Sequence, residues 1–219
     1  MKYIICDGTF LKRNNGVYTI INSETRQIIK GSYGVKEGVK DLMLFYSELK
    51  QAGLEPKVAT VDGNTQQIKY LQKVWSSIKI QRCIVHVQRQ GLSWCRRNPK
   101  STEAKHLREL FLILPTVTTK QQSQDFIKGV YAWEKRFGIR VESSPNRGWV
   151  FSDLLRARSM LLKALPNLFH YLDDPKIARS TNAVEGYFSR LKEHYRLHRG
   201  LAKHNRKNYF QWYFYLKQK

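Results

Sequence analysis

The spacing of hydrophobic positions changes along the chain. Runs with the short spacing that is typical of strands come first. Runs rich in β-branched and aromatic residues predict five strands, at residues 3–12, 16–25, 26–34, 56–62 and 79–87. The first two are joined by a turn at Asn14-Asn15-Gly16, because these residues tolerate the positive φ angles of tight turns. The first three runs therefore predict an antiparallel meander.

Apolar residues return every three or four positions in the other segments, which predicts helices. These segments are residues 35–53, 68–75, 101–114, 118–137, 149–165 and 179–200. The order begins β-β-β-α-β-α-β, so the first strand can take a parallel neighbour through a helical crossover. From about Gln90 to Ala178 the pattern is helical only and indicates an insertion. The aromatic run from Tyr209 predicts an element packed on the core rather than a base-stacking platform.

One acidic residue interrupts the first strand. Asp and Gly are depleted in strands, and Asp7-Gly8 is a common turn pair. If the chain reverses at Asn14-Asn15-Gly16 instead, Asp7 lies in mid-strand, where a carboxylate costs stability unless a partner such as a metal ion compensates it. Asp7 is therefore either a turn residue or a functional carboxylate.

Two more acidic residues occupy positions suited to ligand binding. Asp62 follows the fourth strand, at the edge where open α/β sheets bind ligands, although it can equally be a helix N-cap. Glu185 begins a late helix, where it either completes a capping box with Asn182 or serves as a ligand. Because strands one and four can be parallel neighbours, Asp7 and Asp62 can approach each other. Glu185 can then complete a set of oxygen ligands for a hard cation such as Mg²⁺.

The charge balance narrows the choice of partner. The 219 residues include 39 Lys and Arg against 17 Asp and Glu, a formal net charge of +22, and 42% are hydrophobic, as in a folded protein. This surplus favours a polyanion, and the sequence has no apolar stretch long enough for a membrane span. Nucleic acid is the predicted partner. Three cysteines without a signal-peptide pattern indicate a reducing, cytoplasmic location.

Basic residues concentrate near the end of the chain. From Arg190 to Lys207, Glu193 is the one acidic residue. The basic residues of this segment are Arg190, Lys192, Arg196, Arg199, Lys203, Arg206 and Lys207. Runs of charge usually form a solvated face. Here the run adjoins Glu185, and Lys192 and Arg196 share a helix face with it, so a track for DNA phosphates is the favoured interpretation.

Three segments, in this order, resemble the catalytic core of Mutator-like DDE transposases of bacterial insertion sequences. They read CDGTFLKR, ATVDGNTQQIKYLQKVWSSIKIQRCIVHVQRQ and RSTNAVEGYFSRLKEHYRLHRGL, and carry Asp7, Asp62, Cys83-x-x-His86 and Thr181-Asn182-x-x-Glu185. The resemblance implies an α/β fold, a ribonuclease-H-like mixed five-stranded sheet with a large all-helical insertion between the second Asp and the Glu. Residues 1–89 and 179–219 would form the core, and residues 90–178 the insertion.

The same resemblance implies a function and a site. Asp7, Asp62 and Glu185 would bind two Mg²⁺ or Mn²⁺ ions, water would cut a phosphodiester at the element's ends, and the freed 3′-hydroxyl would attack target DNA. His86 and Asn182 would contact DNA. Assembly as a homo-oligomer on DNA and association with the nucleoid are expected. Family members usually carry an N-terminal end-recognition region, which this chain is expected to lack, as a fragment, a split gene or a decayed copy would.

Three residues have further interpretations. Cys83 and His86 are either half of a zinc site, with Cys95 and His106 as the remaining ligands, or a cysteine packed in a strand and a histidine at its end. Trp149 either stacks on a flipped base or packs in the core.

The sequence therefore leaves three candidate functions. The favoured one is a DDE transposase catalytic domain. The alternatives are a structure-specific nuclease on the same fold, which cuts DNA without joining it, and a non-enzymatic basic nucleic-acid-binding protein whose acidic residues are caps and turns. A divalent-metal requirement separates the enzymes from the binder, and joined products separate the transposase from the nuclease.

Overall fold

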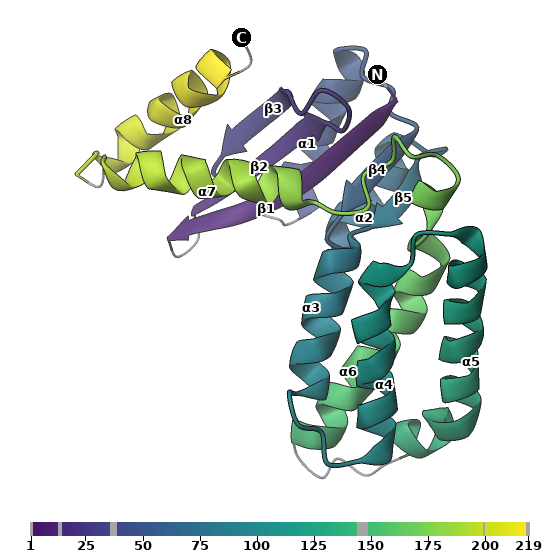
Figure 1. The fold of residues 1–219 in the computed structure, drawn as a ribbon. Coiled ribbons are helices and arrows are strands. Elements are labelled where there is room, and N and C mark those ends of the chain that lie inside the picture. The colour runs from purple at the N-terminus through teal and green to yellow at the C-terminus, as the bar shows by residue number, and fades with distance from the viewer. Residues whose placement is uncertain (1, 13–14, 36–38, 144–148, 199, 218–219) are drawn as a thin grey trace. The chain divides into compact units, whose positions relative to one another are not determined.

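The computed structural model describes residues 2–12, 15–35, 39–143, 149–198 and 200–217 (Figure 1). The chain forms two compact units, Met1–Gln81 with Lys176–Lys219, and Arg82–Pro175. The elements of the first are β1 (Tyr3–Lys12), β2 (Asn15–Asn22), β3 (Ile28–Tyr33), α1 (Val39–Gln51), β4 (Val58–Val61), α2 (Thr65–Val74), β5 (Lys79–Arg82, whose last residue belongs to the second unit), α7 (Asn182–Arg196) and α8 (Lys203–Lys217).

The sheet of the first unit has five strands in the order β3-β2-β1-β4-β5. β2 lies antiparallel to both β1 and β3, and β4 lies parallel to β1, with Tyr3 opposite Val58 and Ile5 opposite Thr60. The predicted mixed sheet, with a parallel neighbour added to the first strand, is confirmed.

Both faces of this sheet are covered by helices. Because side chains of a strand alternate between faces, Ile4 and Cys6 of β1 join a core with α1 and α2, whereas Ile5 joins a core with α7 and α8. In Figure 1, α7 crosses in front of β1 and β2, and α1 and α2 lie behind. The unit is thus a three-layer α/β/α arrangement, in which the position of a residue along its strand determines the pair of helices that its side chain packs against.

A close contact between α8 and β3 confirms that the aromatic end of the chain packs on the core. Phe210 and Phe214 are buried against the sheet, and a Cβ added at Gly31 would lie 2.2 Å from the ring of Phe214. Glycine at position 31 therefore allows the helix to approach the strand.

We expect Gly31→Ala to lower the free energy of unfolding by about 1–3 kcal/mol, because the added methyl group overpacks this contact. Chemical denaturation measures the change, with Ser32→Ala on the same strand as control. Adding Phe214→Leu to the Gly31→Ala variant should recover part of the loss. A Gly31→Ala variant as stable as the parent would contradict the close packing.

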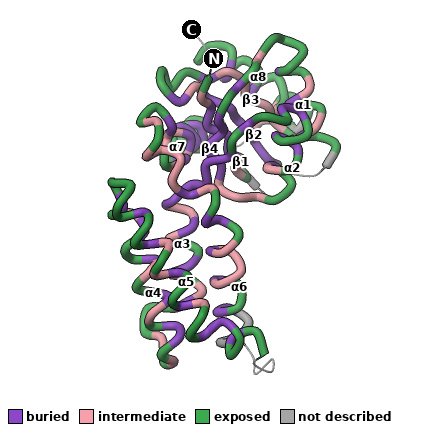
Figure 2. The backbone as a smooth tube through the Cα atoms, turned by 90° about the vertical axis from the view of Figure 1, so that its right-hand side faces the viewer, coloured by how far each residue is buried: buried purple, intermediate pink, exposed green. Residues whose placement is uncertain are grey.

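The second unit is a helical bundle. Its helices are α3 (Ile84–Cys95), α4 (Thr102–Ile113), α5 (Lys120–Glu142) and α6 (Trp149–Ala164), with 3₁₀ turns at Leu114–Thr116, Leu165–Asn167 and His170–Leu172. Ser101 and Thr119 cap α4 and α5, because their hydroxyls accept hydrogen bonds from backbone amides of the first turn. Figure 2 shows buried positions recurring along each helix, and these residues form one apolar core. The described part of residues 90–178 contains only helical elements, as expected for this segment.

Two predicted boundaries are wrong. Asn15 and Gly16 are not in a turn: they belong to β2, opposite Lys12 and Phe10, and residues 13–14 lie outside the described ranges. This register places the apolar positions of both strands on common faces, and burial outweighs the local turn preference.

The fifth strand ends at Arg82 instead of continuing to residue 87. Residues Ile84, Val87, Gly91 and Cys95 are buried with a helical period and pack in the bundle, so tertiary packing overrides the β-propensity of this run.

Candidate active site

Asp7 lies in the middle of β1, opposite Thr19 of β2, so its interpretation as a turn residue is wrong. It is only 6% exposed, and its Oδ1 accepts a hydrogen bond from the Gly8 amide at 2.8 Å. Asp7 shares the strand face of Ile5, two residues before it, and therefore the face covered by α7 and α8. A carboxylate is thus held on a buried, regular strand.

Asp62 directly follows β4, the parallel neighbour of the strand that carries Asp7. Ile5 pairs with Thr60 in the parallel β1–β4 ladder, and each aspartate lies two residues beyond one member of that pair. Paired strands are about 4.8 Å apart, but Asp62 lies one residue beyond the last residue of β4, so its backbone continues past the last residue pair of the β1–β4 ladder. The predicted parallel neighbourhood of strands one and four is confirmed, and the approach of the two carboxylates stays a prediction.

The N-cap interpretation of Asp62 is wrong. Asn64 caps α2, because its Oδ1 accepts hydrogen bonds from the amides of Gln66 (2.9 Å) and Gln67 (3.3 Å). Asp62 Oδ1 instead accepts from the Asn64 amide at 3.0 Å and shapes the loop that leads into the helix.

Glu185 reaches the same face of the sheet from α7. The helix packs on this face through Val184, Phe188 and Leu191, and Glu185 is half-buried next to Val184. Thr181, not Asn182, occupies the N-cap position, which places Glu185 one residue beyond the third position of a capping box. The capping-box interpretation of Asn182 and Glu185 is therefore wrong.

The segment before α7 is tied by hydrogen bonds to β4 and to the residue that follows β2. Thr60 Oγ1 donates to the carbonyl of Ala178 at 2.7 Å, and Ser23 Oγ donates to the carbonyl of Lys176 at 3.2 Å. Thr60 is buried and precedes Asp62 by two residues. The approach of Glu185 to the sheet is thus set by hydrogen bonds from β4 and from the end of β2.

A side-chain network supports the backbone next to Asp7. Where the β4 ladder ends, Gln67 Nε2 donates to the carbonyl of Cys6 at 3.2 Å and also to the hydroxyl of Tyr18, which shares a hydrogen bond with the hydroxyl of Tyr46. A carbonyl oxygen only accepts, so the amide nitrogen of Gln67 must face Cys6. The network anchors the Cys6–Asp7 peptide to α2, β2 and α1.

The titratable groups of this network remain protonated at neutral pH. Burial raises the pKa of both tyrosine hydroxyls well above its ordinary value. Burial, and then the negative charge of Asp7, raise the pKa of the Cys6 thiol in the same direction. The network is therefore uncharged and stays hydrogen-bonded next to the acidic site.

The acidic residues suit a hard divalent cation by their chemistry. Among the residues that the structure describes, no three His, Cys, Asp or Glu side chains are gathered at metal-binding distance. Carboxylate oxygens are the ligands that Mg²⁺ and Mn²⁺ take. In addition, the hydroxyl of Thr19, opposite Asp7, is fully buried and has no hydrogen-bond partner within the described part of the chain. The donor chemistry of these carboxylates thus suits such an ion, although the described side chains are not gathered around one point.

The exposed side of α7 is basic. Its buried stripe contains Val184, Phe188, Leu191 and Tyr195. The exposed residues with a predicted DNA contact are Asn182, Arg190, Lys192 and Arg196, and Arg199 lies outside the described residues. Lys192 and Arg196 continue the face on which Glu185 lies, at helical spacing. A cationic surface therefore begins at the acidic site and runs along the helix.

Cys83 and His86 belong to the helical unit. Cys83 is the N-cap residue of α3 and His86 lies in its first turn, so their placement within a strand is wrong. The His86 Nδ1 and the Cys83 Sγ are 3.3 Å apart. Cys95 is buried, which raises the pKa of its thiol to about 12, and His106 contacts the ring of Phe137. The described residues contain no metal-binding group of three such side chains, and the zinc site stays a prediction.

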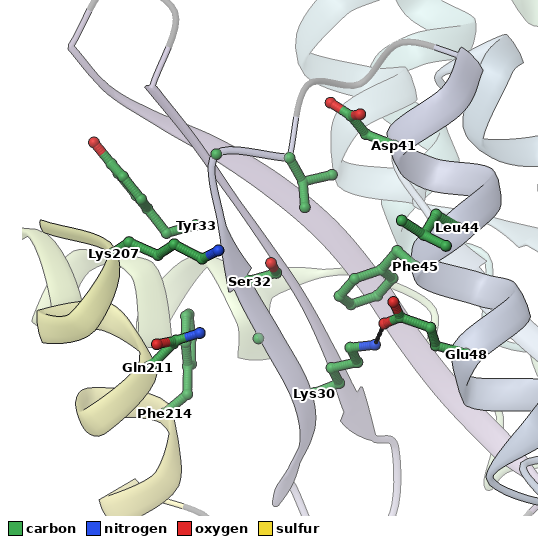
Figure 3. A pocket seen from close by; sticks show the side chains of 13 residues that line it. Lys30, Ser32, Tyr33, Asp41, Leu44, Phe45, Glu48, Lys207, Gln211 and Phe214 are labelled. Atoms are coloured by element: carbon green, nitrogen blue, oxygen red, sulfur yellow. Dashed lines mark hydrogen bonds and ion pairs between the residues drawn. The ribbon is translucent and has the colours of Figure 1, made fainter. Parts of the chain in front are cut away.

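Two other features bear on the site. Trp149 begins α6, but its side chain lies outside the described part of the structure, so its stacking role stays a prediction. A cavity of about 540 Å³ lies at the edge strand β3, between α1 and α8. Figure 3 shows the ion pair of Lys30 and Glu48 in this cavity. Its described lining residues include none of the three predicted acidic ligands.

Together, these observations describe an α/β/α unit with Asp7 on β1, Asp62 directly after the neighbouring strand β4, and a basic helix packed on the sheet. A comparison with protein families identifies it further: the chain matches the family described as "Transposase, Mutator family" over residues 12–149, more than half of its length. The chain belongs to this family of transposases. The match contains Asp62, begins after Asp7 and ends before Glu185. A search of curated proteins gave no match.

Family membership makes the protein a DNA-processing enzyme that binds DNA. None of the helices within the described ranges has the length and hydropathy needed to cross a membrane. Sequence reasoning missed Thr19, because only the strand register shows that its hydroxyl lies opposite Asp7. It also missed Gln67, whose contact with Cys6 depends on where β4 ends.

Proposed function

We propose that this chain is the catalytic domain of a DDE transposase with a ribonuclease-H-like fold, in which Asp7, Asp62 and Glu185 hold Mg²⁺ or Mn²⁺. The observation that supports this most is the parallel pairing of β1 with β4, in which Asp7 lies two residues beyond Ile5 and Asp62 directly follows the last residue of β4. The packing of α7 on the same face adds Glu185. The reactions proposed are cleavage at the element's ends and transfer of the 3′-hydroxyl into target DNA.

In this proposal the divalent ions, when bound, neutralise phosphate charge and stabilise the attacking and leaving oxygens of an in-line displacement. The chain itself supplies position and charge. Asp7 is held by a regular strand and by the Gln67 network, and Asp62 by its loop hydrogen bond. The exposed cations of α7 bind the DNA phosphates and orient the scissile bond. The carboxylates bind the ions and do not attack the phosphodiester themselves.

A strand-transfer assay with pre-cleaved terminal repeats of the neighbouring genomic element tests the proposal. With Mg²⁺ or Mn²⁺ we expect the 3′-end of the repeat to become covalently joined to target DNA, which is read on a sequencing gel. Cleavage without joining would indicate a structure-specific nuclease. Binding without any metal-dependent product would indicate a non-enzymatic DNA-binding protein. Either of these outcomes would overturn the transposase assignment of the site.

A further inference from the structure

Thr19 is a polar residue in a position where the fold itself makes no use of its hydroxyl. Its side chain is fully buried on β2, and Oγ1 has no hydrogen-bond partner among the described residues. Leaving a buried hydroxyl without a partner costs about 1–3 kcal/mol, whereas valine has the same shape, a high strand propensity and no such cost. Stability alone would therefore favour valine at this position.

The position of Thr19 indicates what the hydroxyl is for. Asp7 and Thr19 are directly opposite in the antiparallel β1–β2 ladder, so their side chains share one face of the sheet. The Cβ atoms of such a pair lie about 4.5–5.5 Å apart, within reach of one hydrogen bond between a hydroxyl and a carboxylate. The described Asp7 carboxylate directs Oδ1 to the Gly8 amide.

Thr60 provides an internal comparison. It is also a threonine buried in this sheet, two residues from an aspartate, but its hydroxyl is used in the fold because it donates to the Ala178 carbonyl at 2.7 Å. The hydroxyl of Thr60 therefore has a structural role, whereas the hydroxyl of Thr19 has no partner in the described fold.

We infer that Thr19 is a positioning residue that donates a hydrogen bond to the Asp7 carboxylate when that carboxylate binds the divalent ion. This inference rests on the proposed function, because it needs Asp7 to be a metal ligand. The hydrogen bond holds the carboxylate in its ligating orientation, and partners of this kind contribute about 10–100-fold to metal affinity. The hydroxyl that the described fold leaves without a partner thus serves to orient Asp7 when the ion is bound.

The test uses the whole chain and measures Mn²⁺ binding directly by electron paramagnetic resonance, together with the melting temperature without and with Mn²⁺. We expect Thr19→Val to melt at or above the parent temperature without metal and to bind Mn²⁺ about tenfold or more weakly. Thr19→Ser keeps the hydroxyl and should bind within about threefold of the parent, although serine favours strands less. Ile20→Val, the neighbouring position on the opposite face, should lower stability and leave Mn²⁺ affinity unchanged.

Two results would overturn the inference while leaving the metal site in place. One is a Thr19→Val variant with the parent's Mn²⁺ affinity, and the other is a Thr19→Ser variant that loses as much affinity as Thr19→Val. If the parent chain itself bound no Mn²⁺, the proposed metal site would fail and the role of Thr19 with it. That outcome is recognised from the parent alone, before any Thr19 variant is compared.

Discussion

Replacing any one of Asp7, Asp62 and Glu185 by its amide should lower metal-dependent strand transfer by about a thousandfold or more, because each loses several kcal/mol of transition-state stabilisation. The substitutions are Asp7→Asn, Asp62→Asn and Glu185→Gln, which keep shape and remove charge. Strand transfer is measured with pre-cleaved DNA ends in Mg²⁺ and in Mn²⁺. DNA affinity without metal should hardly change, because none of the three contributes a cation.

Stability measurements separate this role from a structural one. Without metal, each amide variant should melt at or above the parent temperature, because repulsion between neighbouring carboxylates is relieved. Stabilisation by added Mg²⁺ or Mn²⁺ should shrink, since a ligand that binds only the folded state stabilises it by mass action. If all three variants melted well below the parent without metal, yet responded to metal as the parent does, the acidic residues would be structural.

The second large effect concerns DNA affinity. Binding should fall about 10³- to 10⁵-fold between 50 and 200 mM salt if six to ten phosphates are contacted, because bound counterions are released. Replacing Arg190, Lys192 and Arg196 by glutamine should reduce the slope of log affinity against log salt by about 3. Fluorescence anisotropy with labelled duplex DNA at several salt concentrations measures both.

The matched control removes the same charge from another surface. Lys120, Lys128 and Lys135 are exposed on α5, and their replacement by glutamine should change the slope much less. Binding should also be largely independent of sequence. A preference above about a hundredfold, or ~2.7 kcal/mol, for the element's terminal repeat over scrambled DNA would contradict that expectation. Equal slopes for the two triple variants would show that α7 is not the DNA track.

Much of the architecture could be predicted from the local pattern of hydrophobic and polar residues. Alternating hydrophobicity in β1 and β2 and helical periodicity in α4, α5 and α7 predicted these elements, because burial on one face dictates their period. Prediction failed where two patterns compete. The run after Arg82 is β-branched enough for a strand, but its apolar residues also recur at helical spacing, and the bundle core selects the helix.

The candidate site was likewise predicted only in part from the sequence. The residue types and the order of elements made Asp7, Asp62 and Glu185 candidates, yet each also had a local structural interpretation. The fold excludes those local interpretations with particular partners: β2 pairs with the strand around Asp7, Asn64 caps α2, and Thr181 occupies the N-cap position of α7. Such competition between caps cannot be resolved from sequence, since the candidates differ by one or two positions.

The sequence by itself determined the basic charge, the mixed sheet and the helical segments, because these depend on composition and on the period of neighbouring residues. Only the tertiary structure decided the registers that place Thr19 opposite Asp7 and pair Ile5 with Thr60, two residues before Asp62. It also decided that the side chain of Gln67 donates a hydrogen bond to the Cys6 carbonyl at the point where β4 ends. Register and side-chain partners depend on contacts between residues far apart in the chain, and a shift of one residue would turn every strand side chain to the other face.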